Sequence, residues 1–192
     1  KEAIPFFERV LLADRNHYDS NFNLAGCYQG LLIFDKAIEY YKNCSKIDLD
    51  KFEPYHQIGV CFRKMREYED SITNLNKALK ISVNAKTLYV LGNVYRENGQ
   101  FEEARKSFEK SLSVNKEFTQ SKLSIANLEI DNGNYDQASK LLDEIIQSDN
   151  SDHTIISAQI MIGYILKSKG EFEEAIKINK DILEKDPKNI DA

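Results

Sequence analysis

The chain has 192 residues, of which 42% are hydrophobic and 30% are charged, and its formal net charge is -5 at pH 7. This composition predicts a folded domain with a substantial core and excludes collagen-like and disordered chains. The acidic balance argues against general binding to nucleic acid, which needs a basic face to neutralise phosphates. Because no apolar run approaches the roughly 18 residues that a membrane-spanning helix needs, we expect no membrane segment.

The first stretch, residues 1–17, places apolar side chains at the spacing of one amphipathic helix. In each of five segments that follow, the spacing predicts two amphipathic helices joined by a tight turn: 18–51, 52–84, 85–118, 119–152 and 156–189. Three extra residues, 153–155, precede the last of these segments, and residues 190–192 open another one. One helix in the first stretch and two in each of the five segments make eleven helices, so we predict an all-α chain.

The segment 85–118 carries the pattern most completely. Its first helix places Leu, Gly and Tyr on one face, its second places Ala and Phe on one face, and Gly lies at the turn: Leu91, Gly92, Tyr95, Ala104, Phe108 and Gly99. Small residues let two helix backbones approach closely, and Gly accepts the left-handed conformation that often ends a helix. The two preceding segments depart from this pattern, since Leu32 and Arg66 stand at their turns.

This pattern resembles the tetratricopeptide repeat, a helix-turn-helix unit of about 34 residues. The resemblance covers the chain as a half repeat (1–17), five full repeats with the bounds given above, and the start of another at 190–192. It implies an all-α, right-handed α-solenoid, a superhelix whose inner groove is lined by the first helix of each repeat. It also implies that the groove holds an extended or helical segment of a protein partner.

The sequence offers no catalytic constellation. The motifs HExxH, GxSxG, GxGxxG and the Walker phosphate loop are absent, and the three histidines lie in different repeats. We therefore predict no enzyme activity, no metal and no cofactor. Three cysteines without a CxxC pair favour a reducing compartment. They predict a cytoplasmic protein with its cysteines in the core, and nuclear and ciliary locations stay open.

Mapping the groove positions of the family onto this chain gives a set of candidate partner-binding residues. They are Phe22, Gln29, His56, Arg63, Lys64, Lys86, Tyr89, Asn93, Arg96, Asn127 and Tyr164. Cations gather in the middle of this set, and apolar groove positions become more frequent towards its end. Since Arg pairs with carboxylates and Asn can hold a backbone, the set predicts a partner segment that is acidic with an apolar portion. The alternative is a solvated face on which these cations balance neighbouring acids.

One well-known site of the family does not fit. The clamp that grips EEVD-type chaperone tails uses Lys, Asn, Asn, Lys and Arg, whereas the first window of this chain reads Phe22, Gly26, Gln57, Lys86 and Val90. The other two windows also fail to match, so we do not expect a chaperone tail as the partner.

The function expected from these features is a non-catalytic scaffold, cut from a longer protein, that binds a protein segment and orders an assembly. Two alternatives stay open: a substrate-recruiting arm of an enzyme such as a glycosyltransferase, and a subunit of a ciliary trafficking complex. Because each repeat leaves an apolar face for its neighbour, we also expect the two ends to be covered by self-stacking or by omitted parts of the protein.

Overall fold

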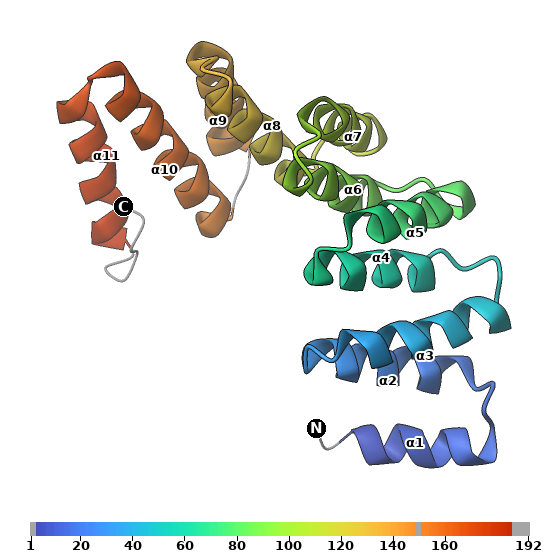
Figure 1. The fold of residues 1–192 in the computed structure, drawn as a ribbon. Coiled ribbons are helices and arrows are strands. Elements are labelled where there is room, and N and C mark those ends of the chain that lie inside the picture. The colour runs from blue at the N-terminus through green and yellow to red at the C-terminus, as the bar shows by residue number, and fades with distance from the viewer. Residues whose placement is uncertain (1–2, 149–150, 186–192) are drawn as a thin grey trace. The chain divides into compact units, whose positions relative to one another are not determined.

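The structure is a computed structural model that describes residues 3–148 and 151–185. Within these ranges it consists of eleven α-helices without a strand (Figure 1). They are α1 (Ile4–Ala13), α2 (Tyr18–Gly30), α3 (Phe34–Ile47), α4 (Glu53–Met65), α5 (Tyr68–Ile81), α6 (Ala85–Glu97), α7 (Phe101–Val114), α8 (Thr119–Asp131), α9 (Tyr135–Ser148), α10 (Asp152–Lys169) and α11 (Phe172–Lys185). The repeat expected to open at 190–192 lies outside the described residues.

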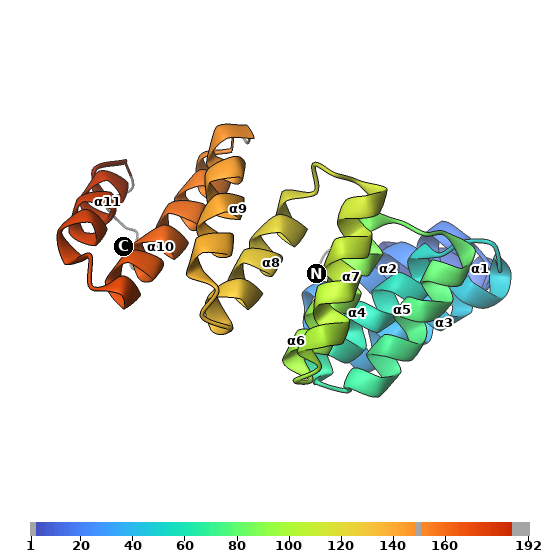
Figure 2. The ribbon, with the colours of Figure 1, turned by 90° about the horizontal axis from the view of Figure 1, so that it is seen from above.

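The helices pack in sequence order. From α1 to α6, and again from α8 to α11, each helix packs against the next one along the chain. Figure 2 shows this neighbour-to-neighbour arrangement for α8 to α11. The predicted all-α fold of consecutive helix-turn-helix units is thereby confirmed.

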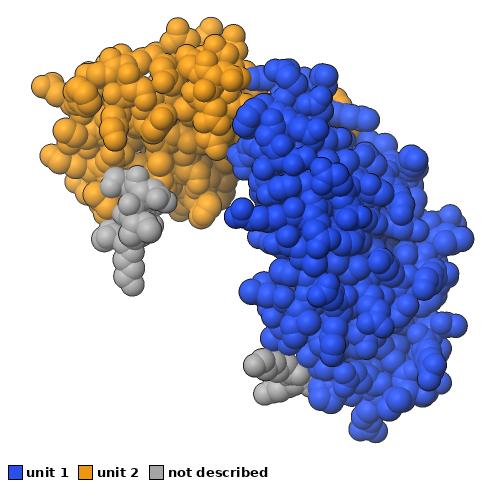
Figure 3. Space-filling view, viewed as in Figure 1, with its two compact units in different colours: residues 1–110 blue, residues 111–192 orange. Residues whose placement is uncertain are grey.

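The chain divides into two compact units, which are coloured separately in Figure 3. Unit 1 comprises residues 1–110 and unit 2 comprises residues 111–192. Unit 1 contains α1 to α6 and the larger part of α7, whereas unit 2 contains the end of α7 and α8 to α11.

Glycine permits close helix contacts in unit 1. A Cβ atom added at Gly92 would meet the ring of Phe108, and one added at Gly59 would lie 2.6 Å from Cγ of Leu75. The core around these contacts includes the fully buried Leu75 and Ile58. The small residues therefore stand where the first and second helices of a repeat touch, as the sequence pattern predicts.

The cysteines follow the expectation in part. Cys44 and Cys61 are buried, whereas Cys27 is only half-buried. All three are free thiols.

Helix α10 is longer than the sequence pattern predicts. It begins at Asp152 and has 18 residues, so residues 153–155 lie inside the helix instead of before it. Nothing between Asp152 and Ile156 breaks a helix, because the stretch contains neither Pro nor Gly. The helix therefore extends backward to Ser151, which serves as its N-cap residue.

Five helix ends share one turn, and this turn positions part of the candidate site. After α4, the N–H of Arg66 donates to the carbonyl of Arg63 at 3.0 Å, and the N–H of Glu67 donates to that of Phe62 at 2.9 Å. These bonds form a Schellman motif. The turn residue has a positive φ at all five ends: 61° at Leu32, 63° at Arg66, 77° at Gly99, 76° at Gly133 and 84° at Gly170.

Leu32 and Arg66 thus adopt the same left-handed conformation as the glycines. For a residue with a Cβ atom, this conformation costs about 1–2 kcal/mol. The absence of Gly at these two turns therefore adds backbone strain but does not change the geometry of the turn.

Candidate partner-binding site

The predicted binding residues fall in both units. Those on α2, α4 and α6 belong to unit 1, whereas Asn127 on α8 and Tyr164 on α10 belong to unit 2. Both predicted binding residues in unit 2 are exposed, and the exposed fraction of Tyr164 is 56%.

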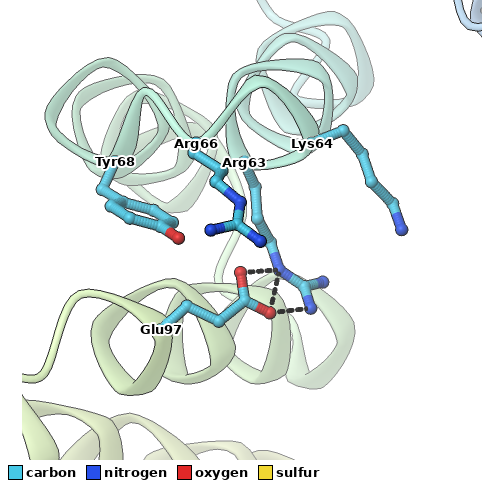
Figure 4. Close-up of a pocket in the computed structure, with 5 residues that line it drawn as sticks. All are labelled: Arg63, Lys64, Arg66, Tyr68 and Glu97. Atoms are coloured by element: carbon cyan, nitrogen blue, oxygen red, sulfur yellow. Dashed lines mark hydrogen bonds and ion pairs between the residues drawn. The ribbon is translucent and has the colours of Figure 1, made fainter.

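Three cations gather where α4 ends. Arg63 and Lys64 lie in the last turn of α4, Arg66 forms the turn, and Tyr68 begins α5. Together with Glu97, the last residue of α6, they line a cavity of about 430 Å³ (Figure 4). We call these five residues the basic pocket.

The carboxylate of Glu97 occupies the guanidinium fork of Arg63. Nε of Arg63 donates to Oε1 and Oε2 of Glu97 at 3.1 and 3.0 Å, and Nη2 donates to Oε1. The side chains of Arg63 and Glu97 are 23% and 33% exposed. Arg63 is therefore half-buried and paired, not a freely exposed groove cation.

The other two cations of the basic pocket differ from Arg63. Among the described residues, neither Lys64 nor Arg66 makes a side-chain hydrogen bond or ion pair. Both side chains are exposed. Figure 4 shows the guanidinium of Arg66 between Tyr68 and Arg63, whereas Lys64 points away from Glu97 on the other side of Arg63. The basic pocket thus combines one satisfied cation with two available ones.

Two predicted binding residues are buried instead of exposed. His56 is 5% exposed and Asn93 is 3% exposed. A ring nitrogen of His56, Nδ1, shares a hydrogen bond of 2.9 Å with Oγ1 of Thr87, which joins α4 to α6. Burial, with a smaller contribution from Lys86, lowers the pKa of His56 to about 4, so the imidazole is neutral at physiological pH. Contrary to what the groove positions predicted, the fold covers both His56 on α4 and Asn93 on α6, and neither lies on an exposed face.

Phe22 and Gln29 are largely committed to packing within unit 1. The ring of Phe22 meets that of Tyr41 edge-on, with 5.2 Å between centroids. Gln29 accepts a hydrogen bond of 2.8 Å from the Tyr41 hydroxyl and donates one of 3.3 Å to Gln57. These side chains connect α2, α3 and α4, so only part of each faces solvent.

The other predicted residues of α6 are more accessible than Asn93. Lys86 is exposed, and Tyr89 and Arg96 are half-buried. The ring of Tyr89 lies 6.0 Å from that of Phe108, so one of its faces is engaged in the fold.

Arg66 and Tyr68 are pocket residues that the groove positions of the family do not include. Both follow the end of α4, outside the helix that carries those positions. The available signal was the cation at a turn that usually takes Gly, directly after Arg63 and Lys64.

The described residues contain no group of three or more His, Cys, Asp or Glu side chains that could hold a metal ion. Burial raises the pKa of the Cys44 and Cys61 thiols to about 12, so both stay protonated and unreactive at neutral pH. In the part of the chain that the structure describes, no helix has the length and apolar character that crossing a membrane demands.

Comparison with known protein families agrees with the fold. Family models described as tetratricopeptide repeat match residues 50–117, 95–159 and 156–189. The chain therefore belongs to the tetratricopeptide repeat family. Proteins of this family are usually non-catalytic and typically mediate protein–protein interactions.

Several curated proteins are similar in sequence. The bovine BBSome complex member BBS4 is 24% identical over 157 residues, which cover 80% of this chain and 30% of that protein. The TPR repeat-containing protein MJ1428 of Methanocaldococcus jannaschii is 26% identical over 199 aligned residues (98% of this chain, 34% of that protein). The CTR9 homolog of Arabidopsis thaliana is 27% identical over 173 residues (85% and 16%). The chain thus spans about a third of the length of these relatives or less.

Solved structures share the fold at low sequence identity. The type IV pilus biogenesis factor PilW has a TM-score of 0.83 and is 18% identical, with 99% of this chain and 87% of that chain covered. YrrB, described as a TPR protein with an unusual peptide-binding site, has a TM-score of 0.68 at 17% identity, with coverage of 96% and 94%. MamA has a TM-score of 0.70 at 22% identity, with coverage of 89% and 92%. At such identities the likeness shows the fold alone.

Proposed function

We propose that this protein is a non-catalytic scaffold that binds an acidic segment of a protein partner through the first helices of unit 1. The basic pocket carries this proposal. Within a chain of net charge -5, three cations share one cavity, and among the described residues only Arg63 of these three is paired with an acid. Lys64 and Arg66 thus remain available to a partner's carboxylates.

The neighbouring side chains fit the same kind of partner. Lys86 and Arg96 extend the positive charge along α6, and Tyr68 and Tyr89 offer aromatic surface beside it. The planar guanidinium of Arg suits bidentate pairing with carboxylates, and an aromatic ring suits an adjoining apolar residue. The bound segment is therefore acidic with an apolar portion, as the groove positions of the family imply.

The remaining candidate residues take supporting roles in this proposal. Phe22 and Gln29 contribute the exposed parts of their side chains, whereas His56 and Asn93 shape the first helices from inside the fold. Asn127 and Tyr164 are candidate contacts within unit 2, taken by itself. The repeat bounds proposed from the sequence define which helices count as first helices.

Two of the similar proteins support a role in binding. YrrB is described as having a peptide-binding site, and BBS4 as a member of a complex. By analogy, this chain serves as part of a larger protein or multiprotein assembly. The free cysteines favour the cytoplasm as its compartment. The similarity to a complex member is also compatible with the narrower alternative named from the sequence, a subunit of a ciliary trafficking complex.

Site-specific photocrosslinking tests the proposal. A photoreactive amino acid would replace Lys86 on α6 or, as the matched control, Lys80 on α5; both lysines are exposed in unit 1. We expect a protein partner to crosslink at position 86 and not at position 80. A partner that crosslinks at position 80 alone would contradict the proposal.

A further inference from the structure

The donors in the basic pocket outnumber what one carboxylate can accept. Arg66 offers five N–H donors, Lys64 offers three and Tyr68 offers one. Arg63 uses Nε and Nη2 for Glu97, and no hydrogen bond of its Nη1 occurs among the described residues. A carboxylate presents two oxygens, whereas a phosphate group presents three.

The charge of the basic pocket also favours a phosphate group over a single carboxylate. Three cations and one carboxylate leave an excess of two positive charges. The carbonyl ends of α4 and α6 offset part of it, each with about half a negative charge. The remaining excess, about one to two charges, matches a phosphorylated side chain, which carries about -1.5 to -2 at neutral pH.

Glu97 closes the fork of Arg63 to a partner's carboxylate. A single carboxylate that bound in the fork of Arg63 would replace one carboxylate by another and add no charge pairing. An anion of the partner must instead meet Arg66 and the Tyr68 hydroxyl while Glu97 keeps its place, and there a phosphate has a third oxygen that a carboxylate lacks. Figure 4 shows that this hydroxyl lies beside the guanidinium of Arg66.

We propose that the basic pocket binds a phosphorylated Ser, Thr or Tyr side chain of the partner in preference to Asp or Glu. This inference rests on the proposed function, because it names the acidic group of the partner segment. Arg66 and Tyr68 hold the phosphate, and Lys64, on the other side of Arg63, adds positive charge to the basic pocket.

A titration followed by NMR tests this preference. The probes are phosphoserine and glutamate, each blocked at both ends, added at equal ionic strength to ¹⁵N-labelled protein while the arginine Nε–H signals are recorded. We expect blocked phosphoserine to bind about tenfold more tightly than blocked glutamate. Arg66→Gly should abolish most of this difference. Leu32→Gly is the matched control, since it relieves the same left-handed strain at another turn and should leave binding unchanged.

The charge state of the probe provides a second readout. The phosphate group of blocked phosphoserine loses its dianionic form as the pH falls through about 6. Its affinity should therefore fall between about pH 7.5 and about pH 5, whereas that of blocked glutamate, which stays ionised, should not. The five residues of the basic pocket include no histidine, so the change belongs to the probe.

The outcomes separate this inference from the proposed function. Equal affinities for the two blocked amino acids, or an Arg66→Gly variant that binds phosphoserine normally, would overturn the phosphate preference. If a partner still crosslinks at position 86 in that case, the scaffold function stands with a carboxylate-bearing partner. Failure of both experiments would overturn both proposals.

Discussion

Arg63 and Glu97 join consecutive first helices through a bidentate ion pair, with Nε of Arg63 at 3.1 and 3.0 Å from the two carboxylate oxygens. Arg63 lies in the last turn of α4, and Glu97 is the last residue of α6. The pair therefore connects two repeats at the edge of the candidate site. It also sets how much positive charge the basic pocket can offer to a partner.

A double-mutant cycle measures the strength of this pair. We expect Arg63→Gln and Glu97→Gln to show a coupling energy of about 1 kcal/mol or less, because both side chains are partly exposed. The coupling should shrink in high salt, when measured by urea unfolding. Lys64→Gln combined with Glu97→Gln is the control, and it should show no coupling. Equal coupling in both cycles would refute the pairing.

Substitutions at the turns should change the free energy of unfolding in opposite directions. Arg66→Gly and Leu32→Gly should each raise the free energy of unfolding by about 0.5–1 kcal/mol. This is the relief of left-handed strain minus the entropy that an added Gly gives to the unfolded chain. Gly99→Ala should lower it by about 1 kcal/mol, since Ala disfavours a φ of 77°. Chemical denaturation checks all three values, and a stabilising Gly99→Ala would be inconsistent with the turn geometry.

The burial of His56 should make the stability of the protein depend on pH. Its pKa falls from 6.5 to about 4 on folding, so the unfolded chain binds more protons than the folded one between these values. The stability that neutral His56 contributes is thus fully present above pH 6.5 and is lost as the pH falls towards 4. The total loss in the free energy of unfolding is about 3 kcal/mol.

Urea unfolding from pH 7 to 4 checks this dependence. The advantage of the wild type over His56→Gln should shrink along this range, whereas the exposed His153→Gln control should keep a constant offset. A constant offset for His56→Gln as well would show that His56 is not buried in its neutral form.

Replacing two helix glycines by Ala should have opposite effects on stability. Gly92→Ala should destabilise unit 1 by about 1–3 kcal/mol, because the added methyl group would meet the ring of Phe108. Gly26→Ala should stabilise it by about 1 kcal/mol, because its Cβ atom would make only an ordinary contact, 3.7 Å from the Tyr41 hydroxyl. Thermal unfolding of the two variants compares them directly. Destabilisation by Gly26→Ala would indicate that this glycine is needed for packing.

The helices were predictable from the sequence because each repeat restates the same pattern of small and apolar residues. The departures at Leu32 and Arg66 did not alter the turns, since the Schellman hydrogen bonds and the packing of both flanking helices fix the backbone there. The start of α10 was missed because the repeat length, and not a helix-breaking residue, set the expected boundary.

The candidate site was predictable only in part. Groove positions give the direction in which a side chain leaves its helix, but not how far neighbouring helices cover it, so the burial of His56 and Asn93 was missed. The pairing of Arg63 with Glu97 depends on side-chain conformations across two repeats, which the spacing of residues does not specify. Arg66 and Tyr68 enter the basic pocket through the turn that follows α4.

The affinity of the crosslinked partner for charge-reversed variants tests the central claim, that cations of the basic pocket hold an acidic segment. Lys64→Glu with Arg66→Glu reverses the two available cations of the basic pocket. The control, Lys42→Glu with Lys80→Glu, reverses the same number of exposed charges on α3 and α5. Circular dichroism should show equal helix content for both.

In a titration calorimetry measurement of the dissociation constant, the pocket variant should bind about tenfold more weakly or worse, and the control should stay within about twofold of the wild type. Equal weakening by both double variants would show that overall charge, and not the basic pocket, governs binding. Unchanged affinity of the pocket variant would contradict the account.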